Sequence, residues 1–461
     1  MIRRTLQFGA GMAAILAALA ATPLHAGIFR AYLSLSGNDG NACTLQAPCR
    51  LLPAALAAAN DGGEVWMLDS ANYNNAPVVV DKGIKILAIP GEVGSVVGNS
   101  GVDALIINAP GKDVTLRNLV VLNLGGAING VNIQDAAAVH IEKTTVHDFS
   151  DPSGACIRFT NTNASLRMFI DDSFLRHCRT AIQMTVLGLP TGNRASLIVD
   201  NTRIERAFAN SGGSLAVWQQ GCIDITFRNG TISRQDVAFQ VDSLVAGCFP
   251  ALRVQNAAIT RVTTGIQVSN ATPSAYHSVY LTNSEIGSPL DGIVYSNSGD
   301  TAQLNLELVD SNVTDCGNNG VMLVNTATDN TAGINFNAAR ANITHVANDA
   351  ITLNAPNGSR VRAWVRDSTI SNVTGRVVKT GGAVGTVQIS LIRSNMNAAG
   401  YVLDHGYGTV RLDGNHMTNL TNTFVNNGSA DVRSLNNNWL TNFTNTTPGF
   451  VYITPTIISP I

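Results

Sequence analysis

The stretch Leu252-Arg-Val-Gln-Asn-Ala-Ala-Ile259, followed by Gly265-Ile-Gln-Val268, recurs in altered form along most of the chain. With Ile259 as the reference, equivalent residues stand 21 to 30 positions apart from one to the next. We call these residues the anchors: Val121, Val146, Leu175, Ile204, Ile232, Ile259, Ile286, Val313, Ile343, Ile370, Met396, Met417 and Trp439. A near-constant period of this length is typical of a solenoid or another repeat array.

Each repeat carries two short strand patterns. Apolar residues stand seven and five positions before nearly every anchor, as at Leu252 and Val254, with mixed residues between them. This alternation of period two predicts a strand with one face inward. A second strand follows as Gly or Ala and then apolar-any-apolar, as in Gly320-Val-Met-Leu323. Because no repeat shows an apolar period of 3.6, a helical array is disfavoured.

Short strands that stack coil upon coil bury apolar surface that no single coil could bury alone. The repeat therefore predicts an all-β fold, a right-handed parallel β-helix. We expect a single-stranded solenoid of about 13 to 14 coils, one for each anchor, with a short N-terminal capping helix.

A column of asparagines supports this interpretation. Three residues before the anchor stand Asn118, Asn201, Asn229, Asn256, Asn283 and Asn436. Asparagine accepts a left-handed backbone and bonds turn amides with its side chain. In coils about 4.8 Å apart, such side chains can also bond to one another.

The repeat and its Asn column resemble the pectin-lyase-like superfamily of parallel β-helices, which includes pectate lyases, polygalacturonases and many secreted proteins. The resemblance covers roughly residues 63–447. The start of the chain, Tyr32-Leu-Ser-Leu-Ser-Gly-Asn-Asp39 with Pro48-Cys49-Arg50, is similar to the opening segment of bacterial members. The resemblance implies a protein that binds or cleaves polysaccharide.

The chain divides into four segments. Residues 1–26 combine Arg3-Arg4, an apolar Ala/Leu run and a final Ala26, the pattern of a secretory signal peptide. The apolar run is too short and Ala-rich to favour a membrane span. We expect an N-terminal cap at 27–62 with a helix over 51–60, the β-helix at 63–447, and a closing strand and tail at 448–461.

Composition narrows the partners. Charged residues make up 13% of the chain, the formal net charge is −2, and no basic run of the kind that binds nucleic acid is present. We expect a secreted or periplasmic monomer whose partner is a polysaccharide or surface glycan.

Seven cysteines in an exported chain suggest disulfides with one thiol left over. Cys43 and Cys49 close a short loop, which makes them the first predicted pair. Cys222 and Cys248 stand at similar places in adjacent coils and form a second candidate pair. The remaining three give no pairing: Cys156 and Cys178 do not share a column, and Cys316 has no evident partner.

A first polar cluster precedes the second strand of four consecutive coils. It comprises Asp291, Asn319, Asp349 and Arg376 in one column, Lys379, and the turn residues Asp315 and His345. Carboxylates beside a histidine and cations suit acid–base cleavage of a glycosidic bond. They also suit proton abstraction with charge stabilisation in a uronate lyase, with Asn319 binding substrate. Alternatively, Asp and Asn before Gly are ordinary turn residues.

The cluster resembles the site of polygalacturonases, which carry Asn-Thr-Asp, Asp-Asp, Gly-His-Gly and Arg-Ile-Lys on successive coils. Asp291, Asp315, His345 and Arg376-Val-Val-Lys379 are similar in type and order. None of the four motifs is complete in this chain.

A second polar cluster consists of Glu142, Asp171 and Asp200, which stand four residues before their anchors in consecutive coils. Three stacked carboxylates offer the oxygen ligands that calcium prefers, and the group resembles the calcium cluster of pectate lyases. The alternative is a structural column whose charge is balanced by Arg117 and Arg228 on either side.

A third group comprises His177, Arg206, Arg234 and Arg261, which occupy one turn position in successive coils. Such a basic stripe could steer an acidic polysaccharide, or it is a solvated row of turn residues.

Two function classes follow from the sequence as a whole. One is a secreted lyase or glycoside hydrolase acting on a uronic-acid-containing glycan; the other is a non-catalytic exported β-helix that binds glycan or has a structural role.

Overall fold

The computed structural model describes residues 27–99, 101–160, 165–188, 194–206, 213–242, 244–287, 290–382, 386–398, 400–405, 408–420, 422–426, 430–434, 438–443 and 456–457. The predicted signal peptide lies outside this part of the chain, and so does most of the predicted tail.

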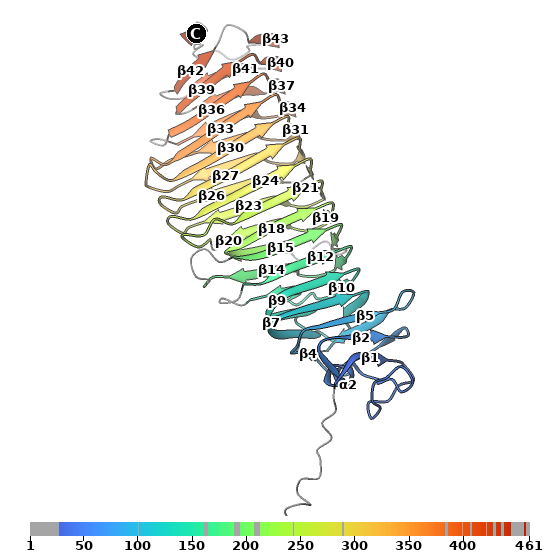
Figure 1. Cartoon of the computed structure of the whole chain (residues 1–461). Coiled ribbons are helices and arrows are strands. Elements are labelled where there is room, and N and C mark those ends of the chain that lie inside the picture. Colours follow the sequence, from blue (N-terminus) through green and yellow to red (C-terminus); the bar gives the residue numbers. More distant parts are fainter. Residues whose placement is uncertain are drawn as a thin grey trace, which may run out of the picture.

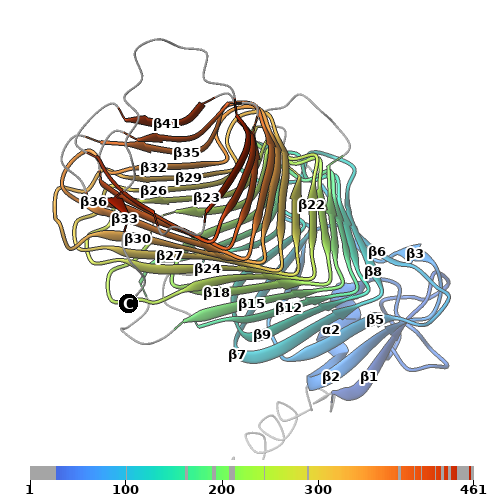
Figure 2. The same ribbon diagram turned by 90° about the horizontal axis from the view of Figure 1, so that it is seen from above.

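The chain forms a parallel β-helix, which confirms the predicted fold class (Figure 1). Strands of successive coils pair in parallel throughout the described stack. Seen from above, the coils enclose an apolar core between three faces (Figure 2). We call them the first, second and third face in the order in which each coil meets them, starting from the strand that precedes the Asn column.

The first face carries the strand with alternating inward residues. Its strands are β1 (Ile28–Leu33), β2 (Ala59–Met67), β5 (Ile84–Ala88), β12 (Arg167–Asp171), β15 (Ala195–Asp200), β18 (Ile223–Arg228), β21 (Ala251–Gln255), β24 (Tyr276–Thr282), β27 (Gln303–Val309), β30 (Gly333–Ala339), β33 (Arg360–Arg366), β36 (Thr386–Ile392), β39 (Gly408–Asp413), β42 (Ala430–Ser434) and β44 (Thr456–Ile457).

The second face contains the anchors. Its strands are β3 (Ala71–Asn72), β6 (Gly94–Gly98), β8 (Leu119–Asn123), β10 (Thr145–His147), β13 (Phe174–Arg176), β16 (Arg203–Glu205), β19 (Thr231–Ser233), β22 (Ala258–Thr260), β25 (Glu285–Gly287), β28 (Asn312–Cys316), β31 (Asn342–Val346), β34 (Thr369–Val373), β37 (Asn395–Ala398), β40 (His416–Leu420) and β43 (Trp439–Phe443).

The third face carries the Gly/Ala-apolar-any-apolar strand. Its strands are β4 (Val78–Val80), β11 (Ala155–Phe159), β14 (Thr180–Val186), β17 (Leu215–Gly221), β20 (Val237–Asp242), β23 (Thr264–Asn270), β26 (Asp291–Asn297), β29 (Val321–Asn325), β32 (Ile351–Asn354), β35 (Arg376–Gly381), β38 (Tyr401–His405) and β41 (Asn422–Asn426). Two long strands, β7 (Leu105–Arg117) and β9 (Val131–Glu142), run through the third face into the first.

The predicted register holds along the second face except at its end. Anchors of neighbouring coils pair with each other, as Ile259 does with Ile286. At the last step, however, Met417 pairs with Leu440, and Trp439 pairs with His416. The anchor assigned to Trp439 was therefore wrong by one residue, and the side chain of Trp439 is 66% exposed. Two adjacent large apolar residues left the alternation ambiguous there.

The Asn column is confirmed as a ladder at a left-handed turn. Asn256 and Asn283 have φ of 50° and 46°. The Asn283 Nδ2 donates to Asn256 Oδ1 at 2.7 Å, and Asn256 Nδ2 donates to Asn229 Oδ1 at 3.2 Å. The same position is left-handed in coils without asparagine, for example at Lys143 and Arg340. The turn is thus imposed by the coil, and asparagine is, after glycine, among the residues that it strains least. Asn436 lies outside the described residues.

The start of the stack differs from the prediction in detail. The helix α2 (Leu52–Ala58) is shorter than expected, because the chain enters β2 directly at Ala59. The strand β1 was not predicted; it pairs in parallel with β2 and so adds a strand beyond the expected first coil. Leu52, Ala55 and Leu56 of the helix are buried, and they cover the apolar end of the stack.

Three disulfides are present, and two of them were predicted. Cys43 is bonded to Cys49, and Cys222 is bonded to Cys248. The expectation that Cys156 and Cys178 do not pair was wrong, because their Cα atoms lie 5.6 Å apart and their sulfurs are bonded. Cys156 belongs to β11, whereas Cys178 lies in the turn that enters β14 of the next coil. Cys316 is buried and forms no disulfide.

Within the described residues, no helix is long and apolar enough to cross a membrane.

Candidate functional site

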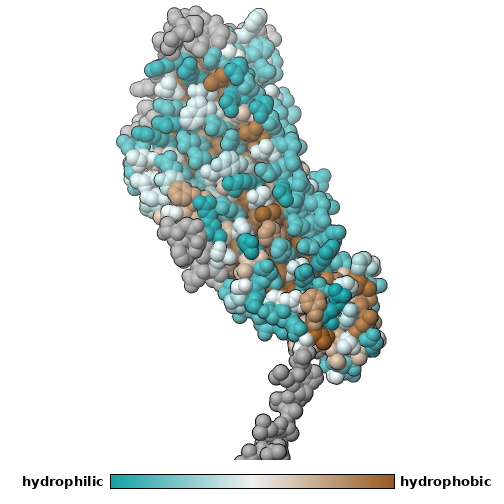
Figure 3. Space-filling model, viewed as in Figure 1, coloured by the Kyte–Doolittle hydropathy of each residue, from teal (hydrophilic) through white to brown (hydrophobic). Residues whose placement is uncertain are grey.

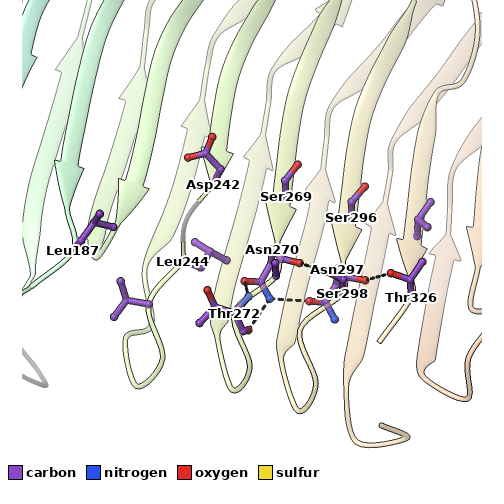
Figure 4. A pocket seen from close by; sticks show the side chains of 13 residues that line it. Leu187, Asp242, Leu244, Ser269, Asn270, Thr272, Ser296, Asn297, Ser298 and Thr326 are labelled. Carbon is purple, nitrogen blue, oxygen red and sulfur yellow. Dashed lines mark hydrogen bonds between the residues drawn. The ribbon is translucent and has the colours of Figure 1, made fainter. Parts of the chain in front are cut away.

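A groove of about 820 Å³ crosses the third face where its strands end (Figure 4). It lies over the C-terminal ends of β20, β23, β26 and β29, so consecutive coils each contribute side chains to it. The lining comprises Leu187, Asp242, Leu244, Val245, Ser269, Asn270, Ala271, Thr272, Ser296, Asn297, Ser298, Val324 and Thr326.

A second asparagine ladder holds the floor of this groove. Asn270, Asn297 and Asn325 are the last residues of three successive strands, and all three are buried. Asn270 Nδ2 donates to Asn297 Oδ1 at 2.7 Å, and Asn297 Nδ2 donates to Asn325 Oδ1 at 2.9 Å. Asn270 also accepts from the backbone N–H of Thr272 at 3.0 Å. These bonds satisfy buried amides and fix the turns that follow the strands.

The walls of the groove combine hydroxyl groups with apolar side chains. Ser269 and Ser296 pair in register and stand side by side in Figure 4. Leu187, whose side chain is 43% exposed, and the buried Leu244 supply apolar surface. At one end, Asp242 Oδ2 accepts a 3.0 Å hydrogen bond from Trp218 Nε1. A few placed polar groups on an apolar lining are typical of small-molecule and sugar sites.

The first predicted cluster is brought together, but at the opposite edge of the third face. Asp291, Asn319, Asp349 and Arg376 share one register position before the strands. Six residues of extended strand separate Asp291 from Asn297 of the groove, a distance of about 20 Å. The predicted catalytic column therefore does not line the groove.

Within this column, the carboxylates carry structural bonds. Asp291 Oδ1 accepts from the backbone N–H of Asn319 and from its side-chain amide, both at 3.1 Å. Asp349 is only 1% exposed. Arg376 Nη1 donates to it at 3.2 Å, and Lys379 Nζ lies 3.7 Å from its Oδ2. An enclosed, doubly paired carboxylate is not presented to a substrate in this conformation.

Asp315 and His345 occupy equivalent left-handed turn positions in adjacent coils, with φ of 57° and 54°. Both are exposed. The ring Nε2 of His345 lies 3.2 Å from Asn372 Nδ2 of the next coil. The predicted alignment of these residues is therefore present as a row on the turn that leads to the third face.

The second predicted cluster forms the expected column on the first face. Glu142 pairs in register with Asp171, and Asp171 with Asp200. Asp200 Oδ2 accepts from Arg228 at 2.8 Å, and Arg117 Nε lies 3.6 Å from Glu142 Oε2. In the described part of the chain, no group of three His, Cys, Asp or Glu side chains is placed to hold a metal ion. The calcium site stays a prediction.

Asp171, between two other carboxylates, is expected to destabilise the fold at neutral pH. Partial burial, and then the charges of Asp200 and Glu142, raise its pKa above the usual 3.8. A raised carboxyl pKa contributes stability that is present below pH 3.8 and lost as pH rises through the folded pKa. We therefore expect Asp171→Asn to stabilise the protein at pH 7 by about 0.5 kcal/mol, allowing for solvent screening, and to have no effect at pH 3.

Urea unfolding at both pH values measures this effect. Glu307→Gln is the matched control, because Glu307 lies on the same face between Tyr280 and Asn337, which are uncharged at neutral pH. Equal midpoints for Asp171→Asn and wild type at pH 7 would contradict the expected repulsion.

The basic stripe is assembled from residues in different environments. His177 Nδ1 lies 2.7 Å from Asp148 Oδ1, and Arg234 Nη1 donates to Glu205 at 3.0 Å. Arg206 is buried, which lowers its pKa, whereas Arg261 is exposed. The four residues follow one edge of the second face, but they do not present four solvated cations.

The groove lies outside every cluster predicted from the sequence. Its signal was an asparagine that recurs 27 and 28 residues apart at Asn270, Asn297 and Asn325, directly after the second strand pattern. A polar residue that recurs at an inward position indicates a buried ladder of side-chain hydrogen bonds. Such a ladder fixes the conformation of the turns that follow it. That signal would have directed attention to the C-terminal edge of the third face.

No model of a known protein family matches the chain, and no curated protein sequence matches it. Among solved structures, it is similar to the GH136 lacto-N-biosidase from Eubacterium ramulus, with a TM-score of 0.45, 12% identity, and coverage of 78% of this chain and 67% of that one. It is also similar to the catalytic domain of a GH87 alpha-1,3-glucanase in complex with nigerose, with a TM-score of 0.44, 11% identity, and coverage of 82% and 66%.

A third neighbour is tailspike protein 3 of bacteriophage CBA120, with a TM-score of 0.41, 10% identity, and coverage of 91% of this chain and 62% of that one. At these identities the likeness is one of fold alone. The fold that the sequence resemblance implied, a parallel β-helix, is the fold of this chain.

Proposed function

We propose that the protein binds polysaccharide along the groove of the third face. The observation that carries the proposal is the groove itself, which is open and built from equivalent positions of consecutive coils. Its hydroxyls, such as Ser269 and Ser296, repeat at the coil spacing of about 4.8 Å. Leu187 and Leu244 add apolar surface toward one end of the groove. A glycan chain offers the matching combination of repeated hydroxyl groups and apolar ring faces.

Binding is favoured over cleavage by the charges present. Hydrolysis of a glycosidic bond commonly uses two carboxyl groups, about 5 to 9.5 Å apart. The described lining contains one, Asp242, which is already bonded to Trp218. The carboxylates of Asp291 and Asp349 lie at the other edge of the face, where Asp291 accepts from Asn319 and Asp349 is paired with Arg376. Because the described lining residues include no cation, we propose a neutral stretch of glycan as the ligand of this groove.

Blocking the groove tests the proposal. In native gels that contain embedded neutral or acidic polysaccharides, the mature chain is expected to be retarded by at least one neutral glycan. The double variant Ser269→Tyr/Ser296→Tyr should weaken this binding about tenfold or more, because two bulky side chains fill the groove while the strands keep residues that favour a sheet. Apparent affinities come from retardation over a range of glycan concentrations.

Thr231→Tyr is the matched control, because Thr231 is exposed on the second face, away from the groove. Retardation that survives the groove variant would contradict binding there. Reducing ends or unsaturated uronates in the same mixtures report cleavage. If such products vanish in Asp291→Ala, the site is catalytic and lies at the opposite edge.

A further inference from the structure

One strand of the first face presents an unusual set of outward side chains. The strand β33 reads Arg-Val-Arg-Ala-Trp-Val-Arg, and its three apolar residues are buried in the core. Its outward residues, which we call the arginine strip, are Arg360, Arg362, Trp364 and Arg366. Because alternate residues of a strand face the same way, the strip is a line of side chains about 20 Å long. Apolar residues separate these arginines in the sequence, so they form no basic run there.

The charges of the arginine strip are not neutralised within the described part of the chain. There, none of its three guanidinium groups takes part in an ion pair, and the buried Nε of Arg362 has no hydrogen-bond partner. The acidic residue next along the chain, Asp367, is held by Arg393 through both carboxylate oxygens, at 2.7 and 2.9 Å. Cations about 7 Å apart along one strand repel each other. A polyanion laid along the strip would remove this repulsion.

The neighbours of the strip extend it as an open surface. Trp364 pairs in register with Asn337 on one side and Ser390 on the other, and the partners of Arg362 are likewise uncharged amides. One coil beyond Ser390, the same row carries the exposed Arg411. The first face looks toward the viewer in Figure 3, where hydrophilic residues surround a few hydrophobic ones near β33. An extended cationic surface of this kind suits a linear polyanion better than a small anion.

The side chains of the strip narrow the kind of polyanion. Trp364 stands between Arg362 and Arg366, and 38% of its side chain is exposed. In proteins that bind single-stranded nucleic acids, cations follow the phosphates while bases stack on aromatic rings. The polar atoms of the strip are donors only, because neither guanidinium nor the indole N–H can accept. Phosphodiester oxygens are acceptors only, whereas the hydroxyl groups of an acidic glycan must also donate.

We propose that the arginine strip binds single-stranded nucleic acid. Arg362 and Arg366 donate to phosphate oxygens on either side of Trp364, and one base stacks on the indole. A single strand is favoured over a duplex, because the bases of a duplex are stacked on one another and do not reach the ring. The strip lies on the first face, so the proposal does not depend on the polysaccharide groove of the third face.

Fluorescence anisotropy of a labelled oligothymidine of about 20 nucleotides, titrated with the mature chain, tests the proposal. We expect binding in the micromolar range at about 50 mM NaCl. Each phosphate neutralised on a single strand contributes about −0.7 to the slope of log affinity against log salt, so three arginines give about −2. Affinity should therefore fall about fifteenfold between about 50 and 200 mM NaCl. The absence of binding overturns the proposal, and so does equally tight binding of a duplex of the same length.

Variants of the strip separate its two contributions. Arg362→Gln/Arg366→Gln should weaken the oligonucleotide at least tenfold and bring the salt slope from about −2 to about −0.7. Trp364→Ala should weaken it about fivefold or more with the slope unchanged, because stacking on an aromatic ring releases no counterions. Unchanged binding in the double arginine variant overturns the proposal. Unchanged binding in Trp364→Ala overturns the stacked base, and with it the choice of nucleic acid over other polyanions.

Arg203→Gln/Arg340→Gln is the matched control, because it removes the same charge from exposed arginines that are paired with Glu205 and Asp310. This control should keep at least half of the wild-type affinity. An equal loss in the control and in the double arginine variant of the strip would show that only net charge matters, which overturns the proposal. Polygalacturonate of equal total charge is the competitor of the other class. If it displaces the oligonucleotide as well as unlabelled oligothymidine does, the strip is a general polyanion surface, and the proposal is overturned.

Discussion

Acidification from pH 6.5 to 4.5 is expected to lower the free energy of unfolding by about 2 to 3 kcal/mol through one side chain, His277. His277 points into the core and is 1% exposed. Burial lowers its pKa from 6.5 to about 3. The unfolded chain therefore binds a proton first as the pH falls. The stability contributed by the neutral ring is complete above pH 6.5 and is lost progressively between pH 6.5 and 3.

The surroundings of His277 support this expectation. Its Nδ1 lies 3.2 Å from the hydroxyl of Tyr295, which donates to the carbonyl of Asn305 at 3.1 Å. No carboxylate contributes to the pKa shift, for which burial is the one cause. A protonated ring would thus be a buried charge without a counter-ion, which is among the least favourable states in a protein interior.

His277→Leu should remove most of the pH dependence in this window. Leucine suits the position, because the same inward column holds Leu304, Ile334 and Val361 in the next coils. Urea unfolding at pH 7, 5.5 and 4.5 gives the slope. His345→Gln, which changes an exposed histidine, should keep the wild-type slope. If His277→Leu also keeps it, the acid sensitivity lies elsewhere.

Asp171, whose raised pKa makes its contribution grow as the pH falls, is present in wild type and in His277→Leu alike, so the difference between the two reports His277. The carboxylates with a lowered pKa act mainly at lower pH. Partial burial opposes the shift, but hydrogen bonds from His147 and His177 hold the pKa of Asp148 below 3.8. Bonds from Asn229 and Arg228 do the same for Asp200. Groups with a lowered carboxyl pKa contribute stability that is present above about pH 3.8 and lost as the pH falls through the folded value. Their effect begins mainly below the window in which His277 acts.

The fold was predictable because the same inward column of apolar residues recurs in every coil. Each further repeat therefore gives independent support for the assigned strand register. Prediction failed where that redundancy ends. At the last coil, Trp439 and Leu440 are both apolar, and only the pairing with β40 decides between them. The disulfide between Cys156 and Cys178 joins a strand to a turn of the next coil. Aligning the repeats by their strands shows which strand residues are neighbours, but it does not show which turn residues lie close to a strand.

The membership of the polar columns was equally predictable, but the environment of each side chain was not. Asp291 and Asp349 stand in one column, yet the first bonds the turn of the next coil and the second is buried under Arg376. Such differences depend on which partner reaches across from the neighbouring coil. The groove was missed for a related reason, since its position follows from a buried ladder at the ends of strands, where Asn297 alone looks like any turn residue.

Gly221→Ala is expected to destabilise the protein by about 3 kcal/mol. Gly221 ends β17 with φ of 90°, a conformation that residues with a Cβ rarely adopt. A Cβ added there would lie 2.0 Å from the carbonyl oxygen of Val186 and 3.0 Å from the side chain of Leu187. That carbonyl accepts the 3.0 Å hydrogen bond from the N–H of Cys222. Backbone strain and overpacking of 1 to 3 kcal/mol each add, because the obstacle is backbone and cannot rotate away.

Gly287→Ala is the matched control for this substitution. Gly287 ends β25, its φ is not positive, and the nearest atom to an added Cβ is the Ile259 oxygen at 3.8 Å. We expect its free energy of unfolding, measured by urea denaturation, to stay within about 0.5 kcal/mol of wild type. Because Val186 leads directly into Leu187 of the groove, Gly221→Ala should also weaken glycan binding by the molecules that remain folded. If both glycine variants have the same free energy of unfolding, the backbone after β17 can rearrange easily around an added Cβ. The neighbouring Leu187 would then not be held in a fixed position at the groove.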